Sequence, residues 1–198
     1  MLDCRMVRLR FLGPIGAGRF PTDPEALDAL AVPAVYLRLK LYAGGRTVAY
    51  AGQSVNLLSR IDQHLTRLLS FAQPLRDADG DAWFSATREA RFDAYNDLAR
   101  TLALARAEAE RARFYYAPCD DAFTPDLLPL AEAALIGRLR AGGGACENRT
   151  GAPIAELDRT VGFKSDVAAL DAADRDLIET LIGRAPMTLV PVESADVD

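Results

Sequence analysis

Residues 34–52 read Ala-Val-Tyr-Leu-Arg-Leu-Lys-Leu-Tyr-Ala-Gly-Gly-Arg-Thr-Val-Ala-Tyr-Ala-Gly, and the other elements are best placed relative to them. Apolar and polar residues come to alternate within 34–41, which is typical of a strand with one buried and one solvated face. Gly44 and Gly45 supply a tight turn, and residues 47–50 return as a second strand. The stretch therefore predicts a β-hairpin whose first strand is half-buried.

A helix is predicted directly after the hairpin, because the spacing of apolar residues changes there from two to 3.6. Its apolar stripe consists of Leu57, Leu58, Ile61, Leu65, Leu68 and Leu69. Ser54 or Asn56 is available as the N-cap. Arg60 and His64 lie on the neighbouring face, one turn and about 6 Å of rise apart, so both can point at one ligand. Spacing alone favours an ordinary polar helix face.

The same patterns predict further elements along the chain. They are strands at 7–12, 113–117 and 187–190, helices at 23–30, 90–111, 127–140 and 171–182, and an irregular excursion at 70–87. The length of 198 residues favours a single domain. The predicted class is α/β, with a small central sheet that contains antiparallel strands and is flanked by helices.

Histidine is the most restrictive count in the composition. The chain has one histidine, His64, which excludes an H-E-x-x-H zinc site, a two-histidine iron site and a paired-histidine zinc finger. The three cysteines, Cys4, Cys119 and Cys146, are odd in number and far apart. We expect free thiols in a reducing compartment rather than disulfides or a zinc site.

Neither a membrane span nor a signal peptide is expected. The longest run without a charged residue covers 13 residues, 47–59, whereas a span needs about 20 apolar residues. Asp3, Arg5 and Arg8 occupy N-terminal positions where a signal peptide would need an apolar stretch. We therefore expect a cytoplasmic protein without membrane contacts.

Glu132 is an acidic residue among apolar ones on the helix predicted at 127–140. Its neighbours three and four residues away are Leu128, Leu135 and Ile136. A carboxylate on such a stripe costs several kcal/mol if it is buried without a partner. Three explanations remain open, namely a place at the helix edge, an ion pair, or a bound metal ion.

Two tripeptides in the hairpin resemble the signature of the GIY-YIG nuclease family. They read Ala34-Val35-Tyr36 and Tyr50-Ala51-Gly52. Residues 52–61 are similar to the family's turn into its first core helix, which carries an arginine. Ala34 replaces the first glycine of the signature and Ala51 replaces a branched residue. Both are small changes at backbone-forming positions.

The residues that the resemblance assigns to catalysis occur in the family's order. They are Tyr36, Tyr50, Arg60, His64, Glu132 and Asn148. The resemblance covers about residues 33–70 and 113–151 and implies a GIY-YIG-like core. Residues 71–112 then form a helical insertion and residues 152–198 a C-terminal extension.

The resemblance implies a metal-dependent endonuclease that hydrolyses DNA phosphodiester bonds, with a restriction-type enzyme as the preferred subtype. Glu132 would bind one divalent ion, and a single carboxylate with several waters suits Mg²⁺. Arg60 would hold a non-bridging phosphate oxygen. Tyr50, with Tyr36 as its hydrogen-bonded partner, would deprotonate or orient the attacking water. His64 would pass the proton on or bind the phosphate.

Contacts with DNA are expected beside this site. The candidates are Gln53, Ser54, Asn56 and Arg67, with Asn148 orienting the site. Lys and Arg number 23 and Asp and Glu 28, for a formal charge of −5. Because affinity for DNA comes mainly from cations, we expect modest binding by the chain alone, or help from a homodimer or a partner protein. Phe84, Phe92 and Tyr95 in the insertion are candidates for contacts with bases, although core packing is their expected role.

A non-catalytic nucleic-acid or protein-interaction module on the same fold is the alternative interpretation. The two alanine replacements and the acidic charge motivate it. All six reactive positions are retained, which a binding module would not require. A hydrolase acting on another phosphoester is a remote third interpretation.

Overall fold

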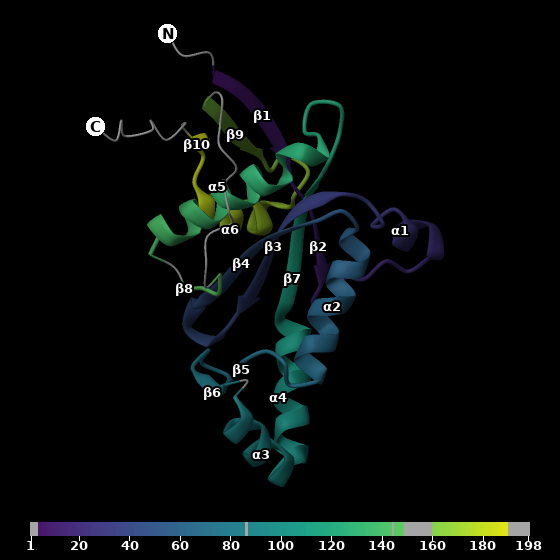
Figure 1. The fold of residues 1–198 in the computed structure, drawn as a ribbon, viewed down its shortest axis with the longest axis vertical. Helices are drawn as coiled ribbons and strands as arrows, with labels where there is room; N and C mark the ends of the chain where they lie inside the picture. The colour runs from purple at the N-terminus through teal and green to yellow at the C-terminus, as the bar shows by residue number, and fades with distance from the viewer. Residues whose placement is uncertain (1–3, 86, 144, 149–159, 190–198) are drawn as a thin grey trace, which may run out of the picture.

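A computed structural model describes residues 4–85, 87–143, 145–148 and 160–189. The fold is α/β, with mixed sheets flanked by helices, as the sequence predicts (Figure 1). None of the helices in these ranges combines the length and the hydrophobicity that a bilayer crossing needs.

The central sheet has five strands and is built around the predicted hairpin. In spatial order they are β2 (Leu12–Gly16), β7 (Ala112–Pro118), β3 (Ala34–Leu41), β4 (Thr47–Ser54) and β8 (Ala145–Cys146). The strand β3 pairs with both β4 and β7 in antiparallel fashion, and its Tyr36 lies opposite Gly52 and Tyr116. Only the short β8 is parallel to its neighbour. The hairpin prediction is confirmed.

A second sheet consists of β1 (Cys4–Arg10), β9 (Thr160–Asp166) and β10 (Met187–Leu189). The prediction of one strand at 7–12 is wrong, because β1 pairs in parallel with β9 while β2 joins the central sheet. Residue Phe11, between β1 and β2, still donates its N–H to Asp166 O at 2.8 Å. The partner strand β9 carries no clear sequence pattern, so the division between two sheets was not predicted.

The helices begin and end close to their predicted positions. They are α1 (Pro24–Asp28), α2 (Leu57–Leu69), α3 (Arg88–Asn96), α4 (Leu98–Arg111), α5 (Leu128–Ala141) and α6 (Ala172–Ile182). The single helix predicted at 90–111 is wrong. Asp97 leaves helical geometry, with φ −125° and ψ 59°, and its side chain caps α4 instead. Short acidic side chains favour such caps over helix interiors.

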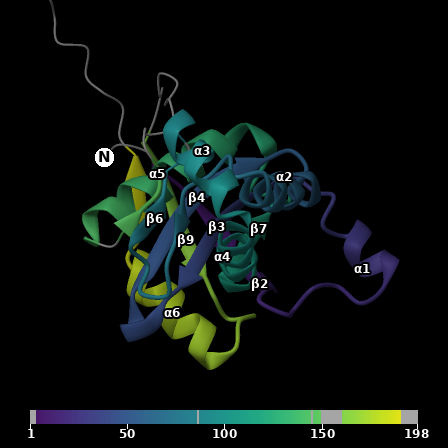
Figure 2. The ribbon, with the colours of Figure 1, turned by 90° about the horizontal axis from the view of Figure 1, so that it is seen from below.

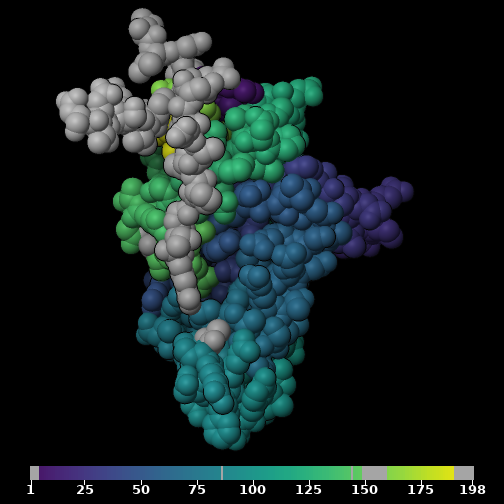
Figure 3. Space-filling model, viewed as in Figure 1, coloured from purple at the N-terminus to yellow at the C-terminus, as the bar shows by residue number. Residues whose placement is uncertain are grey.

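The insertion forms its own small core at one end of the molecule. It contains β5 (Leu75–Arg76) and β6 (Ala82–Phe84), the two short strands of its hairpin, besides α3 and α4. Phe71, Leu75 and Phe84 pack there against the end of α2. Figure 3 shows this teal part as the lower end of the molecule, and Figure 2 looks up at that end.

Both faces of β3 are buried, so the prediction of a half-buried strand is wrong. Val35, Leu37 and Leu39 join the main core with α5 and α6. On the other face Arg38 is 3% exposed and Lys40 is 1% exposed. The insertion helix α4 covers that face and contacts β3. Polar residues that alternation assigned to solvent therefore lie in the interior beside Tyr36.

Candidate active site

Four of the predicted catalytic residues meet between the hairpin and α2. The Tyr36 hydroxyl oxygen lies 2.8 Å from His64 Nε2 and accepts a hydrogen bond from Arg60 Nε at 3.0 Å. Arg60 Nη2 reaches the Tyr50 hydroxyl at 3.4 Å. The rings of Tyr50 and His64 are 5.4 Å apart between centroids. Arg60 thus bridges two tyrosines that do not bond each other.

Gly52 makes room for Tyr36. The two residues lie opposite each other on β4 and β3, and a Cβ at residue 52 would lie 2.4 Å from the Tyr36 hydroxyl oxygen. No ordinary contact is that short, so a side chain at residue 52 would displace the ring. The glycine of the second tripeptide is therefore a packing requirement of the tyrosine in the first.

Burial separates the two tyrosines. Tyr36 is completely buried, and Tyr50 is partly exposed. Burial raises the pKa of Tyr36 above its ordinary value, helped by Tyr50, while the Arg60 hydrogen bond lowers it by less. Tyr36 therefore keeps its proton at neutral pH, and Tyr50 is the tyrosine that a ligand can reach.

His64 is buried, and both of its ring nitrogens are bonded to side chains. Nε2 faces Tyr36, and Nδ1 lies 2.7 Å from Arg38 Nη1 and 3.4 Å from Gln73 Nε2. Burial, followed by the charges of Arg38 and Arg60, lowers the pKa of His64 to about 2. The imidazole thus acts on Tyr36 rather than on an outside ligand, unlike the expected phosphate contact or proton relay.

The buried imidazole predicts a loss of stability in mild acid. The pKa of His64 is about 2 in the fold and about 6.5 in an unfolded chain, so the unfolded chain binds an extra proton between these values. This contribution to stability is complete above pH 6.5 and shrinks as pH falls, by about 2 kcal/mol between pH 7 and pH 5. Urea unfolding at both pH values measures it. In His64→Gln this part of the pH dependence should vanish, and an unchanged difference would contradict the burial argument.

Glu132 lies on α5 and is half-buried at the edge of the site. No hydrogen bond or ion pair to its carboxylate is found among the described residues, and Arg60 lies beyond ion-pair distance. Burial raises the pKa of Glu132, and the charge of Arg60 offsets part of that rise. The described residues therefore provide no direct ion pair for this carboxylate. A place at the helix edge and a bound metal ion remain as explanations.

Asn148 acts on the backbone of β4. Its Oδ1 accepts from Ala51 N at 2.9 Å and its Nδ2 donates to Ala51 O at 2.8 Å. The amide thus continues the pairing of β8 with β4 and holds the backbone between Tyr50 and Gly52.

The four expected DNA contacts differ in their surroundings. Asn56 is the N-cap of α2 and accepts from Ser59 N at 3.0 Å. Ser54 Oγ donates to Asn56 O at 2.7 Å and accepts from Asn56 N. Gln53 is half-buried opposite Val35. Of the four residues only Arg67 is charged, and its side chain is exposed on α2.

A buried ionic network beside the site was not predicted. Arg38 pairs with Glu147 through a short contact, and Lys40 Nζ lies 2.6 Å from Glu108 and 3.9 Å from Glu147. The signal was available in β3, since Tyr36, Arg38 and Lys40 are spaced by two and share one face. Alternation alone predicts a solvated face for these residues, and the packing of α4 against β3 buries it instead.

The described residues offer few protein ligands for a divalent ion at Glu132. The described residues contain no group of three or more His, Cys, Asp or Glu side chains that could hold a metal ion. Glu132 offers one carboxylate to which no donor from the described part of the chain is bonded. Mg²⁺ commonly binds one or two carboxylates and fills its other positions with water and phosphate oxygens. The residues present match that pattern.

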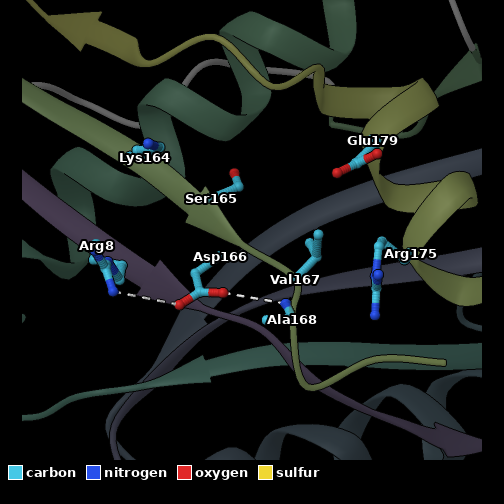
Figure 4. A pocket seen from close by; sticks show the side chains of 8 residues that line it. All are labelled: Arg8, Lys164, Ser165, Asp166, Val167, Ala168, Arg175 and Glu179. Carbon is cyan, nitrogen blue, oxygen red and sulfur yellow. Dashed lines mark hydrogen bonds and ion pairs between the residues drawn. The ribbon is translucent and has the colours of Figure 1, made fainter. Parts of the chain in front are cut away.

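A separate groove is lined by residues of β1, β9 and α6 and of the segment that follows β9. Its volume is about 520 Å³. Figure 4 shows its lining, which includes Arg8, Lys164, Asp166 and Arg175. Arg8 and Asp166 approach each other within 3.8 Å. The groove carries both signs of charge and none of the candidate residues.

No known protein family, curated protein or solved structure matches the chain. Any functional conclusion therefore depends on the geometry of the cluster formed by Tyr36, Tyr50, Arg60 and His64 and on the position of Glu132.

Proposed function

We propose that the chain is a metal-dependent endonuclease of the GIY-YIG type that hydrolyses DNA phosphodiester bonds. The observation that carries the proposal is the bridging of Tyr36 and Tyr50 by the Arg60 guanidinium, with Glu132 near enough for the Arg60 charge to act on it. A cation, a reachable hydroxyl and a carboxylate are the groups that phosphodiester hydrolysis needs. We favour a restriction-type enzyme because the domain carries a large insertion and little else.

Arg60 would bind the scissile phosphate. Its Nε donates to Tyr36. The two outer nitrogens, which donate to Gln63 at 2.8 Å and to Tyr50 at 3.4 Å, are the ones that can bind a phosphate. These contacts are neutral and partly exposed, so a phosphate oxygen, which bears a charge, would replace them. The Tyr50 hydroxyl, released from Arg60, would then orient the attacking water.

Glu132 would hold the divalent ion, for which Mg²⁺ is the best candidate. When bound, the ion would stabilise negative charge on the phosphoryl and leaving oxygens. The protein's own contribution would be to place the carboxylate where the charge of Arg60 offsets part of the cost of its burial. Tyr36 and His64 would not touch the substrate and would hold Arg60 in place.

A cationic and aromatic helix face supports DNA as the partner. Arg88, Arg91, Phe92 and Tyr95 are exposed within one arc of α3 and line a hollow of about 630 Å³. Phe92 is 69% exposed and Tyr95 63% exposed, so core packing is wrong for both, whereas Phe84 does lie in the core. Exposed aromatic rings stack on bases and arginines pair with phosphates.

The direct test is incubation of the purified chain with supercoiled plasmid and Mg²⁺. We expect nicked or linear DNA, and no cleavage once EDTA removes the metal. Re-addition of Mg²⁺ should restore cleavage, which separates metal loss from unfolding. Intact plasmid with folded protein, across several divalent metals and pH values, would refute the proposal.

A non-catalytic DNA-binding module is the second candidate. It is favoured by the internal bonding of Tyr36, His64 and Asn148, each of which already has protein partners. Salt-dependent binding of DNA without any cleavage would identify this function instead.

A further inference from the structure

Arg38 connects the buried side of the site to a carboxylate. It lies on β3 and is 3% exposed. Its Nη1 lies 2.7 Å from His64 Nδ1 and 3.0 Å from Gln73 Oε1, and its Nη2 pairs with Glu147. The guanidinium carbon is also 5.0 Å from the centre of the Tyr50 ring.

The contacts of Arg38 determine which nitrogen of His64 carries the proton. A guanidinium only donates hydrogen bonds, so Nδ1 must accept. Gln73 Oε1 accepts from the same Arg38 nitrogen, so the Gln73 amide turns its N–H toward Nδ1. With two donors at Nδ1, the neutral ring carries its proton on Nε2 and donates it to the Tyr36 oxygen.

The consequence reaches Tyr36. Its oxygen then accepts from His64 Nε2 at 2.8 Å and from Arg60 Nε at 3.0 Å. A phenol hydroxyl both accepts and donates hydrogen bonds. Two donors already bond this oxygen, so the hydrogen bond left to Tyr36 is the one that its own proton donates.

Glu147 holds Arg38 in this orientation. Its backbone N–H donates to Ala49 O at 2.8 Å, which fixes it beside β4. Burial acts to raise the pKa of Glu147, but Lys40, Arg38 and Arg76 together hold it below its ordinary value. The carboxylate therefore stays ionised, and it compensates the charge of a guanidinium that is almost fully buried.

We propose that Arg38 and Glu147 are a positioning pair that locks His64 in the Nε2–H tautomer, so that the Tyr36 oxygen accepts from both His64 and Arg60 and only its own proton is left to donate. The tautomer lock stands on geometry alone, and its consequence for cleavage rests on the proposed function. The ring is faced by Tyr36, Arg38 and Lys40 of β3, Tyr50 of β4, Arg60 and Arg67 of α2, Gln73, and Phe114 of β7. None of these groups is an anion that would favour the imidazolium.

The single histidine makes the test unambiguous. In chain labelled with ¹⁵N-histidine, NMR should show one ring N–H, at Nε2, and an unprotonated Nδ1, both unchanged over the pH range in which the chain is folded. Arg38→Met should produce a mixture of tautomers, while Arg38→Lys, which still donates, should keep the wild-type pattern. The control Arg46→Met removes an exposed arginine of the same hairpin and should change nothing.

The variants also separate the lock from the enzyme activity. If Arg38→Met fails to fold because Glu147 is left unpaired, the double variant Arg38→Met/Glu147→Gln removes both charges and should show the same mixture. An Nδ1–H or doubly protonated ring in the wild type overturns the lock, as does an unchanged tautomer in a folded Arg38→Met chain.

In an active enzyme, Arg38→Met should lower kcat by about 10²-fold with little change in KM. A wild-type chain with the Nε2–H tautomer but no cleavage would refute the proposed function and leave the lock intact.

Discussion

Replacing Glu132 by glutamine should reduce DNA cleavage by about 10³-fold while leaving the fold as stable as before or more stable. Glutamine has nearly the same shape but no charge, so it cannot hold a divalent ion with comparable strength. Rates of plasmid nicking at saturating Mg²⁺ measure the loss. Equal cleavage by Glu132→Gln would show that another group binds the metal.

The stability half of this prediction follows from burial. Burial raises the pKa of Glu132 in the fold, so the folded chain holds the proton more tightly than the unfolded chain does. The stability linked to that proton is complete at low pH and is lost as pH rises through the folded pKa. At neutral pH the ionised carboxylate therefore opposes folding, and glutamine removes this penalty.

A matched control lies on α4. Glu110 is exposed and pairs with Arg106 at 2.7 Å, so Glu110→Gln should change neither cleavage nor stability. A residue whose removal improves stability but abolishes activity is best explained by function. If Glu132→Gln were inactive because it unfolded, chemical denaturation would reveal it.

Replacing Glu108 by alanine should lower the free energy of unfolding by about 3–5 kcal/mol. Glu108 is completely buried on α4, where it pairs with Lys40 at 2.6 Å and accepts from the Tyr42 hydroxyl at 2.7 Å. Its loss leaves the Lys40 ammonium, which is 1% exposed, with only Glu147 at 3.9 Å. Urea unfolding measures the change.

The double variant Lys40→Met/Glu108→Leu distinguishes a buried charge from a lost contact. It removes both ions and fills their space with apolar groups, which is often neutral or stabilising. We expect it to recover most of the stability that Glu108→Ala loses. Glu110→Ala, on the same helix but exposed, should have almost no effect. A double variant as unstable as Glu108→Ala would show that the unpaired Lys40 charge is not the cause, and would point to packing or to the lost contacts with Tyr42 and Arg111.

Local pattern was sufficient for the hairpin, α2, β7 and α5, and the structure selects Asn56 from the two candidate caps of α2. The hairpin combines a period of two with the turn at Gly44 and Gly45, and α2 combines a period of 3.6 with a side-chain cap. The prediction of one helix at 90–111 was wrong because Asp97 caps α4, an effect that helix periodicity does not register. The strand at 160–166 was missed because β9 forms by pairing with β1, more than 150 residues earlier.

The candidate site divides in the same way. Tyr36, Tyr50, Arg60 and His64 come together because the hairpin and the helix that follows it are adjacent in the chain, so short-range spacing controls their geometry. Glu147 and Asn148 arrive from a distant segment and reach β4 only through the parallel pairing of β8. Their roles could not be derived from spacing.

The sequence by itself determined the hairpin, the one-turn separation of Arg60 and His64, and the presence of a lone histidine. Tertiary structure decided what that histidine does. Burial of the second face of β3 by α4 places Arg38 and Lys40 in the interior, where unpaired charges are too costly and must find carboxylates. Arg38 finds Glu147, and in that position it donates to His64. His64, which the sequence places on a helix face that a ligand could reach, therefore bonds Tyr36 and Arg38 in the interior. This outcome depends on charges that are distant in the sequence and that are desolvated only in the assembled fold.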